Sequence, residues 1–258
     1  MKLFNSFNKI VLVVEYDGSH YHGFQWQTGS PTIQAELEEA IHKVTGERSR
    51  VIAASRTDAG VHAKGQVVSF RTQSVLSPQT FVRAFNHYLP ADIAIKGACR
   101  VSADLNVRRD ALNREYDYYI LNDSTRSPLA RGFACLVTGE LNTETMNKAS
   151  RFLEGEHDFA SFATSLGKLR STVRNVYQAK VTRQDDLVTF HIVASSFLPH
   201  QVRNTIGLLI RVGLGKVALE EFHQIMGART VGFAGPTAPA HGLCLTKVNY
   251  PSSLELAV

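Results

Sequence analysis

Apolar residues follow two different patterns along the first hundred residues of the chain: continuous runs and helical spacing. Residues 9–18, "KIVLVVEYDG", form a continuous apolar run that ends in turn residues, which is typical of a buried strand. In residues 30–46 the apolar positions recur at helical spacing, and Ser30 followed by Pro31 predicts a helix start there. The positions expected on the buried face of this helix are Ile33, Leu37, Ile41 and Val44.

The same two patterns divide the rest of the first half. Strands are predicted at residues 51–54, 65–72 and 92–101, and a second helix is predicted to begin at Ser77 and Pro78. The inward-facing positions expected in this helix are Phe81, Phe85 and Tyr88. The resulting order, β-α-β-β-α-β, is the ferredoxin-like plan.

The second half repeats this plan loosely. The elements predicted are a strand at 114–121, a helix at 142–155 that ends at Gly155, a hairpin at 175–197 that turns at 184–186, helices at 199–213 and 218–227, and a last strand at 243–250. The first of these strands places three side chains on one face, namely Tyr116, Tyr118 and Ile120. The helix at 199–213 is expected to face the core with Val202, Ile206, Leu209 and Gly213.

These patterns predict an α+β protein made of two ferredoxin-like halves, residues 1–105 and 106–258. The seam is expected near residues 101–110, where the sequence has the chemistry of a loop and clustered arginines. We expect the antiparallel sheets of the two halves to join edge to edge around a central cleft.

Composition indicates where such a protein works and what it binds. No apolar run in the 258 residues approaches the length that spans a bilayer, and the N-terminus lacks a small-residue cleavage site, so we expect a cytoplasmic protein. The three cysteines are far apart and form no Cys-x-x-Cys pair, which favours core thiols over a disulfide framework or a zinc site. A net charge of +5 favours a polyanionic partner, with nucleic acid as the first candidate.

The most unusual motif is "ASRTDAGVHA" at residues 54–63, directly after a predicted strand. Arg56 and Asp58 lie close together in a turn that Gly60 allows to fold tightly. One interpretation is a turn aspartate that accepts hydrogen bonds from its own backbone. The other is a catalytic carboxylate that nearby positive charge keeps ionised, with Arg203 in the first turns of a helix as a candidate partner.

Other signals are weaker. "GLGKVA", from Gly213, imitates a shortened dinucleotide fingerprint but follows an apolar helix where that motif requires a strand. Histidines near positions 20 and 241 complete no metal site. Two groups of basic residues could collectively attract an RNA backbone, although none is assigned to a phosphate: Arg108, Arg109 and Arg114, and Lys168, Arg170 and Arg174.

Five segments together resemble the tRNA pseudouridine synthase A family, in the order and spacing of that family. They are "VEYDGSHYHGFQWQ", "SRTDAGVHAKGQVVSF", "REYDYYIL", "FLPHQVRNTIG" and "AHGLCLTKVNY", and the resemblance runs over nearly the whole chain. It implies the pseudouridine synthase fold and isomerisation of uridine to pseudouridine at positions 38–40 of the tRNA anticodon arm. It also implies a homodimer whose subunits both hold one tRNA, and neither a metal nor an organic cofactor.

The resemblance also implies a role for four side chains. Asp58 matches the essential catalytic aspartate, and Arg203 matches its basic partner. Tyr116 matches the tyrosine that stacks on the target uracil and is a candidate acceptor for the proton of its C5; on sequence pattern alone it reads as a core tyrosine. Arg56 matches the residue that fills the space left by the extruded base.

Two other function classes are compatible with parts of the sequence. A non-catalytic RNA-binding module is one, since ferredoxin-like sheets are common RNA platforms, and it predicts that Asp58 is dispensable. A nicotinamide-dependent oxidoreductase built on "GLGKVA" is the other, and it requires a strand immediately before Gly213.

Overall fold

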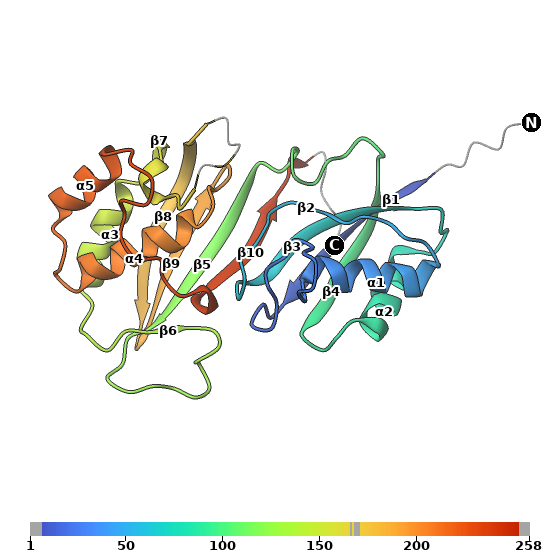
Figure 1. Cartoon of the computed structure of the whole chain (residues 1–258), viewed down its shortest axis with the longest axis horizontal. Coiled ribbons are helices and arrows are strands. Elements are labelled where there is room, and N and C mark those ends of the chain that lie inside the picture. The colour runs from blue at the N-terminus through green and yellow to red at the C-terminus, as the bar shows by residue number, and fades with distance from the viewer. Residues whose placement is uncertain (1–6, 166, 168–170, 253–258) are drawn as a thin grey trace, which may run out of the picture. The chain divides into compact units, whose positions relative to one another are not determined.

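The computed structural model describes residues 7–165, 167 and 171–252, which form two compact units (Figure 1). Unit 1 contains the residues up to Leu112 and those from Leu245 onward, and unit 2 contains Asn113–Cys244. The predicted division into residues 1–105 and 106–258 thus differs in two places. The whole loop up to Leu112 belongs to unit 1, and the last strand returns to that unit.

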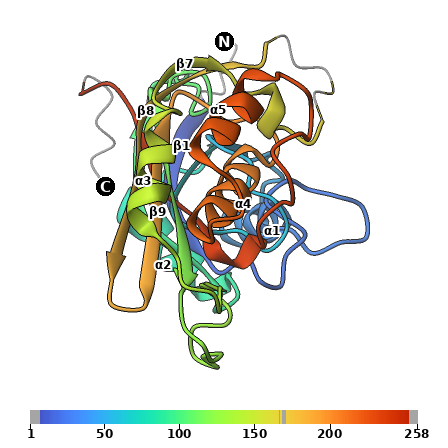
Figure 2. The ribbon, with the colours of Figure 1, turned by 90° about the vertical axis from the view of Figure 1, so that its left-hand side faces the viewer.

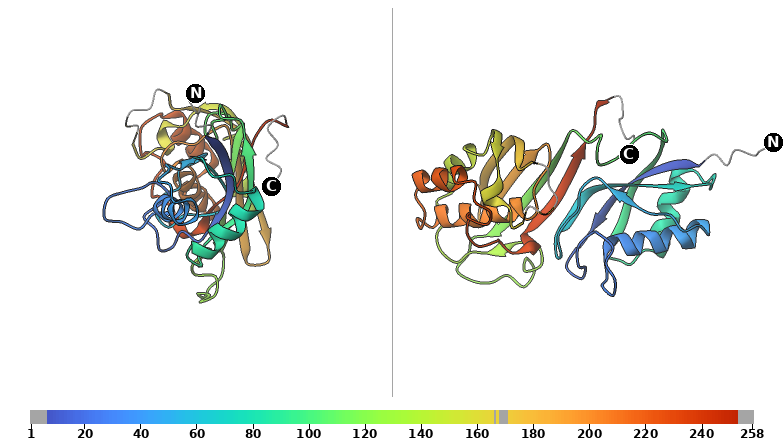
Figure 3. Two further views of the ribbon diagram at one scale, coloured as in Figure 1. Left: turned by 90° about the vertical axis from the view of Figure 1, so that its right-hand side faces the viewer. Right: turned by 45° about the horizontal axis from the view of Figure 1, so that its top comes forward.

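Unit 1 is an antiparallel sheet with two helices packed on one face (Figure 3). Its elements are β1 (Asn8–Tyr16), α1 (Ile33–Thr45), β2 (Ile52–Ala53), β3 (His62–Thr72), α2 (Pro78–Tyr88), β4 (Ile93–Val101) and, from Leu245 onward, β10 (Leu243–Asn249). β1 lies between β4 and β3, and β2 pairs with β3. The predicted β-α-β-β-α-β order is confirmed.

Three phenylalanines hold helix α2 against the sheet of unit 1. Phe70 of β3 contacts Phe81 and Phe85 of α2 at ring-centroid distances of 5.9 and 5.8 Å, and all three are buried. Ser77 caps this helix as predicted, because its hydroxyl accepts a hydrogen bond from the N–H of Thr80. Tyr88 does not face the core: at the last residue of α2 it is 45% exposed and packs edge-on against His87.

Helix α1 begins later than predicted. Its cap is Thr32, whose side-chain oxygen accepts from the N–H of Ala35, and neither Ser30 nor Pro31 lies in the helix. Two of the first N–H groups of the helix are instead bound by the preceding loop, since Ile33 donates to the carbonyl of Gly23 and Gln34 donates to that of Phe24. On the predicted apolar face Ile33, Leu37 and Ile41 are buried, and Val44 is partly exposed.

Unit 2 is a second antiparallel sheet with the order β5-β9-β8-β7 and its own helices. Its elements are β5 (Asn113–Leu121), β6 (Cys135–Leu136), α3 (Thr143–Arg151), β7 (Gly155–Asp158), η1 (Ala160–Phe162), β8 (Val173–Gln184), β9 (Leu187–Ala194), α4 (Gln201–Gly213), α5 (Leu219–Gly227) and η2 (Ala240–Gly242). Helices α3, α4 and α5 lie together beside β8 and β9 (Figure 2). The predicted hairpin turns at Asp185, which adopts a φ of 52°.

Helix α3 ends at Arg151, earlier than the predicted end at Gly155. The chain continues in tight i→i+3 turns, in which Leu153 donates to the carbonyl of Ser150 and Glu154 donates to that of Arg151. Gly155, at a φ of 101°, then begins β7. The glycine therefore marks the start of a strand and not the end of the helix.

The buried faces predicted in unit 2 are confirmed. Tyr116, Tyr118 and Ile120 of β5 are all at most 5% exposed. The four core positions predicted in α4 are also buried, namely Val202, Ile206, Leu209 and Gly213. Among residues 7–165, 167 and 171–252, no helix has both the length and the apolar character needed to cross a membrane.

Candidate active site

The "ASRTDAGVHA" segment forms the connection between β2 and β3 in unit 1. Along it, side chains alternate between the interior and the solvent: Thr57 is buried, whereas Arg56 is exposed and Asp58 is partly exposed. The carbonyl of Asp58 accepts a hydrogen bond from the N–H of Val61, which closes a tight turn, and Gly60 adopts a φ of 76° within it. Asp58 is therefore the first residue of this turn, and the buried Thr57 precedes it.

A buried amide fixes the start of this loop. Gln66 of β3 has no exposed surface, and its side chain binds both backbone groups of Ser55. Its Nε2 donates to the carbonyl of Ser55 over 2.8 Å, and its Oε1 accepts from the N–H of Ser55 over 3.3 Å. The side-chain amide of Gln66 thus makes the two hydrogen bonds to Ser55 that a neighbouring strand would otherwise make, so both backbone groups of Ser55 are paired.

The residue before Asp58 is held by a second buried side chain. The hydroxyls of Thr57 and Tyr16 are 2.8 Å apart, and both residues are buried. Tyr16 is the last residue of β1, just after the register of that strand shifts against both of its neighbours. Such a bulge re-aims the side chains that follow it. β1 and β3 therefore both contribute a polar side chain to the underside of the loop.

A second loop, residues 17–24, packs on the Asp58 loop. Phe24 donates its N–H to the carbonyl of Thr57 over 3.0 Å, and Gly60 donates to the carbonyl of Tyr21 over 3.3 Å. A Cβ at Gly23 would lie 2.8 Å from the carbonyl oxygen of Thr57, so this close approach requires glycine. With these contacts, the backbone on either side of Asp58 is held by β1, by β3 and by the loop at residues 17–24.

Unit 2 carries the predicted stacking residue, Tyr116, on the inner face of β5. Its residue partner in the sheet is Ile192 of β9. The ring meets that of Phe197 edge to face, with centroids 5.2 Å apart and planes at 86°. Phe197 therefore fixes the orientation of the Tyr116 ring.

Arg203, also in unit 2, lies in the first turn of α4 and is partly exposed. Its Nε donates to the carbonyl of Ala238 over 2.8 Å, and its own carbonyl accepts from the N–H of Ala238 over 3.1 Å. The segment that carries Ala238 approaches α4 closely, because a Cβ at Gly207 would lie 2.0 Å from the carbonyl oxygen of Pro236. This clamp fixes the guanidinium through one of its nitrogens.

Comparisons with known proteins identify the family. A sequence profile of the tRNA pseudouridine synthase family matches residues 12–108 and 149–251, which include Arg56, Asp58 and Arg203. The chain belongs to the tRNA pseudouridine synthase family. Proteins named tRNA pseudouridine synthase A match it over most of both lengths. The one from Chloroflexus aurantiacus is 41% identical over 95% of this chain and 90% of its own.

Two further comparisons extend this result. The proteins of the same name from Thermoanaerobacter sp. (strain X514) and Syntrophomonas wolfei are 40% and 39% identical, over 93% and 95% of this chain and 99% and 98% of their own. A solved structure titled "Crystal Structure of a Cbf5-Nop10-Gar1 Complex" matches with a TM-score of 0.37 at 16% identity, over 78% of this chain and 45% of that one. A match this distant carries no argument about the site.

For a tRNA pseudouridine synthase, the two units hold different parts of the predicted site. Unit 1 places Arg56 and Asp58 in one loop, and unit 2 contains Tyr116 and Arg203. The predicted pairing of Asp58 with Arg203 joins the two units and stays a prediction.

The basic residues predicted to attract RNA fall into different environments. Arg108 and Arg109 are exposed, and Arg109 binds the carboxylate of Asp110 at 2.6 Å. The prediction that Arg114 is a surface charge is wrong, because this residue is only 6% exposed. Its Nη1 donates to the carbonyl of Ser195. Arg174 is partly buried, and its burial lowers the pKa of its guanidinium. Lys168 and Arg170 lie outside the described residues.

The sequence pattern missed the residues that hold the Asp58 loop, namely Tyr16, Thr57 and Gln66. A signal for two of them was present. Gln66 and Tyr16 occupy strand positions on the same face as Val68 and Val14, where the alternation calls for apolar side chains. A polar group at such a position needs a partner in the interior, which here is the loop itself.

The structure bears on two of the weaker signals in the sequence, the dinucleotide motif and the possible metal ligands. "GLGKVA" follows helix α4 and not a strand, so the structural requirement for a dinucleotide site is not met. In the described part of the chain, no three or more His, Cys, Asp or Glu side chains gather in a way that could hold a metal ion. Cys135 and Cys244 are buried, Cys99 is partly exposed, and none of the three forms a disulfide.

Proposed function

We propose that this chain isomerises uridine to pseudouridine at positions 38–40 of the tRNA anticodon stem-loop, with Asp58 as the catalytic group. The observation that carries the proposal is the fixed Asp58 loop in a chain of this family. Buried hydrogen bonds hold the residues on both sides of a partly exposed carboxylate, and such preorganisation is typical of a catalytic group.

The reaction needs a carboxylate and no redox chemistry. The N1–C1′ bond of uridine breaks, the uracil turns, and a C5–C1′ bond forms, after which C5 loses its proton. Asp58 either attacks the ribose C1′ or takes the proton of the 2′-hydroxyl as the base leaves. Both routes require a carboxylate in reach of the ribose, and we propose Arg203 as its basic partner.

The target uridine lies in a helical stem and has to leave the base stack, which costs a few kcal/mol. Stacking on an aromatic ring recovers about 1–3 kcal/mol per base. We assign this stacking role to Tyr116, whose ring packs edge to face against Phe197. We propose that the side chain of Arg56 fills the space that the extruded base leaves in the stem. The exposure of Arg56 is consistent with a side chain that enters the RNA stem.

The proposal also covers assembly and setting. The chain works as a cytoplasmic homodimer whose two subunits hold one tRNA, and residues 1–112 and 113–244 supply the catalytic loop and the stacking residue respectively. Sedimentation of the protein with and without tRNA tests the assembly. A monomer that binds one tRNA with full activity would contradict it.

Mapping the product tests the site of modification. Unmodified tRNA transcripts that contain uridine at position 38, 39 or 40 are incubated with the protein, and pseudouridine is located by carbodiimide labelling and primer extension. We expect stops at these positions with wild-type protein and none with Asp58→Asn. Stops at another position would overturn the assigned segment, and tight binding without any stop would favour an RNA-binding module.

A further inference from the structure

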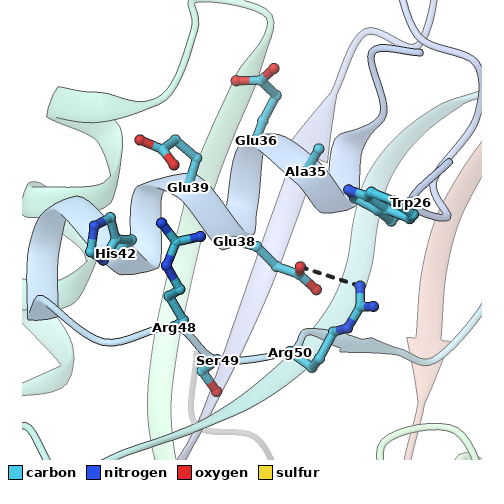
Figure 4. A pocket seen from close by; sticks show the side chains of 9 residues that line it. All are labelled: Trp26, Ala35, Glu36, Glu38, Glu39, His42, Arg48, Ser49 and Arg50. Carbon is cyan, nitrogen blue, oxygen red and sulfur yellow. Dashed lines mark ion pairs between the residues drawn. The ribbon is translucent and has the colours of Figure 1, made fainter. Parts of the chain in front are cut away.

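The single tryptophan of the chain lies on the surface of unit 1, beside an open pocket of about 540 Å³ (Figure 4). Trp26 is 46% exposed, and the guanidinium carbon of Arg50 lies 5.7 Å from its ring centroid. The pocket is lined by Trp26, Ala35, Glu36, Glu38, Glu39, His42, Arg48, Ser49 and Arg50. Its volume is in the range of small-ligand sites, which is about 300–1,000 Å³.

A closed circuit of interactions positions Trp26 and Arg50. The backbone N–H of Trp26 donates to Oε1 of Gln34, and Nε2 of Gln34 donates to Oε1 of Glu38 over 2.7 Å. Oε2 of Glu38 is 3.5 Å from Nη1 of Arg50, whose guanidinium faces the Trp26 ring (Figure 4). Oε1 of Glu38 also accepts from the N–H of Val51. This oxygen therefore binds two donors, while Oε2 pairs with Arg50.

This circuit holds the backbone at Trp26 and leaves the side chains of Trp26 and Arg50 accessible. The Arg50 side chain is 70% exposed, and a surface ion pair of this kind contributes little to stability. An exposed indole next to a guanidinium is instead an arrangement that binds a nucleobase by stacking and cation–π attraction.

The two walls of the pocket carry opposite charge (Figure 4). Helix α1 provides Glu36 and Glu39, whereas the segment before β2 provides Arg48 and Arg50. A nucleotide matches this arrangement, because its base carries hydrogen-bond donors and a π face while its phosphate is an anion. An apolar protein anchor matches it less well, since Ala35 and Trp26 are the only apolar residues of the lining.

The pocket is connected to the Asp58 loop through the backbone. Trp26 follows Phe24 by two residues, and the N–H of Phe24 donates to the carbonyl of Thr57, the residue before Asp58. The loop that leads into Trp26 is therefore the one that packs on the Asp58 loop.

We propose that Trp26 and Arg50 form a binding site for a second nucleotide of the RNA substrate, distinct from the uridine that reacts. The base stacks on the indole, and the phosphate pairs with Arg50 and Arg48. This inference rests on the proposed function, because it takes tRNA as the ligand.

The lone tryptophan gives a direct readout. Titration of wild-type protein with unmodified tRNA is expected to quench the fluorescence of Trp26 saturably, with the midpoint at the Kd measured by filter binding. Trp26→Ala is expected to raise that Kd about 5- to 150-fold, the equivalent of one stacked base, with a much smaller change in the single-turnover rate at saturating tRNA. Trp26→Phe should restore most of the affinity.

Matched variants separate stacking from other effects. Tyr88→Ala removes an aromatic of similar exposure from α2 and is expected to leave the Kd unchanged, whereas Glu38→Gln releases Arg50 and should weaken binding. Unchanged fluorescence together with an unchanged Kd for Trp26→Ala would overturn the site. If tRNA quenches Trp26 but no pseudouridine forms, the site stands and the proposed function fails. If pseudouridine forms but tRNA does not quench Trp26, the proposed function stands and the second nucleotide site fails.

Discussion

At the scale of single residues, the main determinant of the site is a glutamine that makes no contact with solvent. Gln66 binds the N–H and the carbonyl of Ser55, and its Nε2 also lies 3.4 Å from the hydroxyl of Tyr16. The same side chain therefore joins β1, β3 and the Asp58 loop. We expect it to act as a positioning residue, since it touches the loop and not the reacting atoms.

Replacing this amide tests that role. Gln66→Leu removes both hydrogen bonds to the backbone of Ser55, each of which contributes about 0.5–1.5 kcal/mol to the free energy of unfolding. We expect lower stability in guanidinium denaturation and a larger loss in the single-turnover rate than in tRNA affinity. Ser69→Ala is the control on the same strand, because the Ser69 hydroxyl is buried without a partner. A rate loss no larger for Gln66→Leu than for Ser69→Ala would contradict the role.

A second residue-scale prediction concerns pH. On the outer face of the unit 2 sheet, Nδ1 of His191 lies 2.7 Å from the carboxylate of Asp117, and this hydrogen bond raises the pKa of His191 despite partial burial. A raised pKa in the folded state means that protonation stabilises the fold. The contribution is complete below the unfolded pKa of about 6.5 and is lost as pH rises through the folded pKa.

We therefore expect Asp117→Asn to reduce the stability difference between about pH 6 and pH 9. Tyr119, whose hydroxyl also donates to Asp117, provides the control, because Tyr119→Phe removes a hydrogen bond but no charge. Denaturant midpoints at the two pH values measure the effect. Parallel pH curves for wild type and Asp117→Asn would refute it.

At the scale of elements, helix α3 protects an open strand edge. The N–H of Val181 in β8 donates to Oδ1 of Asn147, and the N–H of Ala179 donates to Oε1 of Glu154. The hydroxyl of Ser150 donates to the carbonyl of Ala179. Side chains of α3 and of the turn that follows it thus bind the backbone of β8 on this edge, which removes a site for unwanted pairing.

Asn147→Ala removes one of these contacts. We expect a loss of about 1–2 kcal/mol in the free energy of unfolding and faster hydrogen exchange at the amide of Val181, which becomes a buried donor without a partner. Lys148→Ala, at an exposed position of the same helix, should change neither quantity. Unaltered exchange at Val181 in Asn147→Ala would show that the edge is protected in another way.

The element scale also shows what sequence can predict. Strands and helices with a clear apolar period were predicted within a few residues, as β1, α2 and α4 illustrate. The start of α1 and the end of α3 were wrong, because hydrogen bonds from a distant loop and a run of tight turns decide those ends. Local pattern contains no information about such partners.

At the scale of the whole molecule, the order of the predicted elements is correct, but the short strands β6 and β7 were not predicted, and the last strand illustrates a further limit. β10 follows the helices of unit 2 in the chain, but its residues from Leu245 onward belong to unit 1. A sequence read from one end to the other assigns it to the second half. Sequence likewise identified Asp58 and Tyr116 as candidates through family motifs, and it missed Gln66 and Thr57, whose importance depends on contacts between separate strands.

The central claim is that Asp58 catalyses the isomerisation of uridine. It is tested most directly with tRNA labelled with tritium at C5 of uracil, because formation of the C5–C1′ bond releases that tritium to water. With no cofactor added, we predict stoichiometric release by the wild-type protein and none by Asp58→Asn, although both bind the tRNA with similar affinity. Equal release by the two proteins would remove Asp58 from the centre of the reaction, and binding without release by either would contradict the enzymatic account.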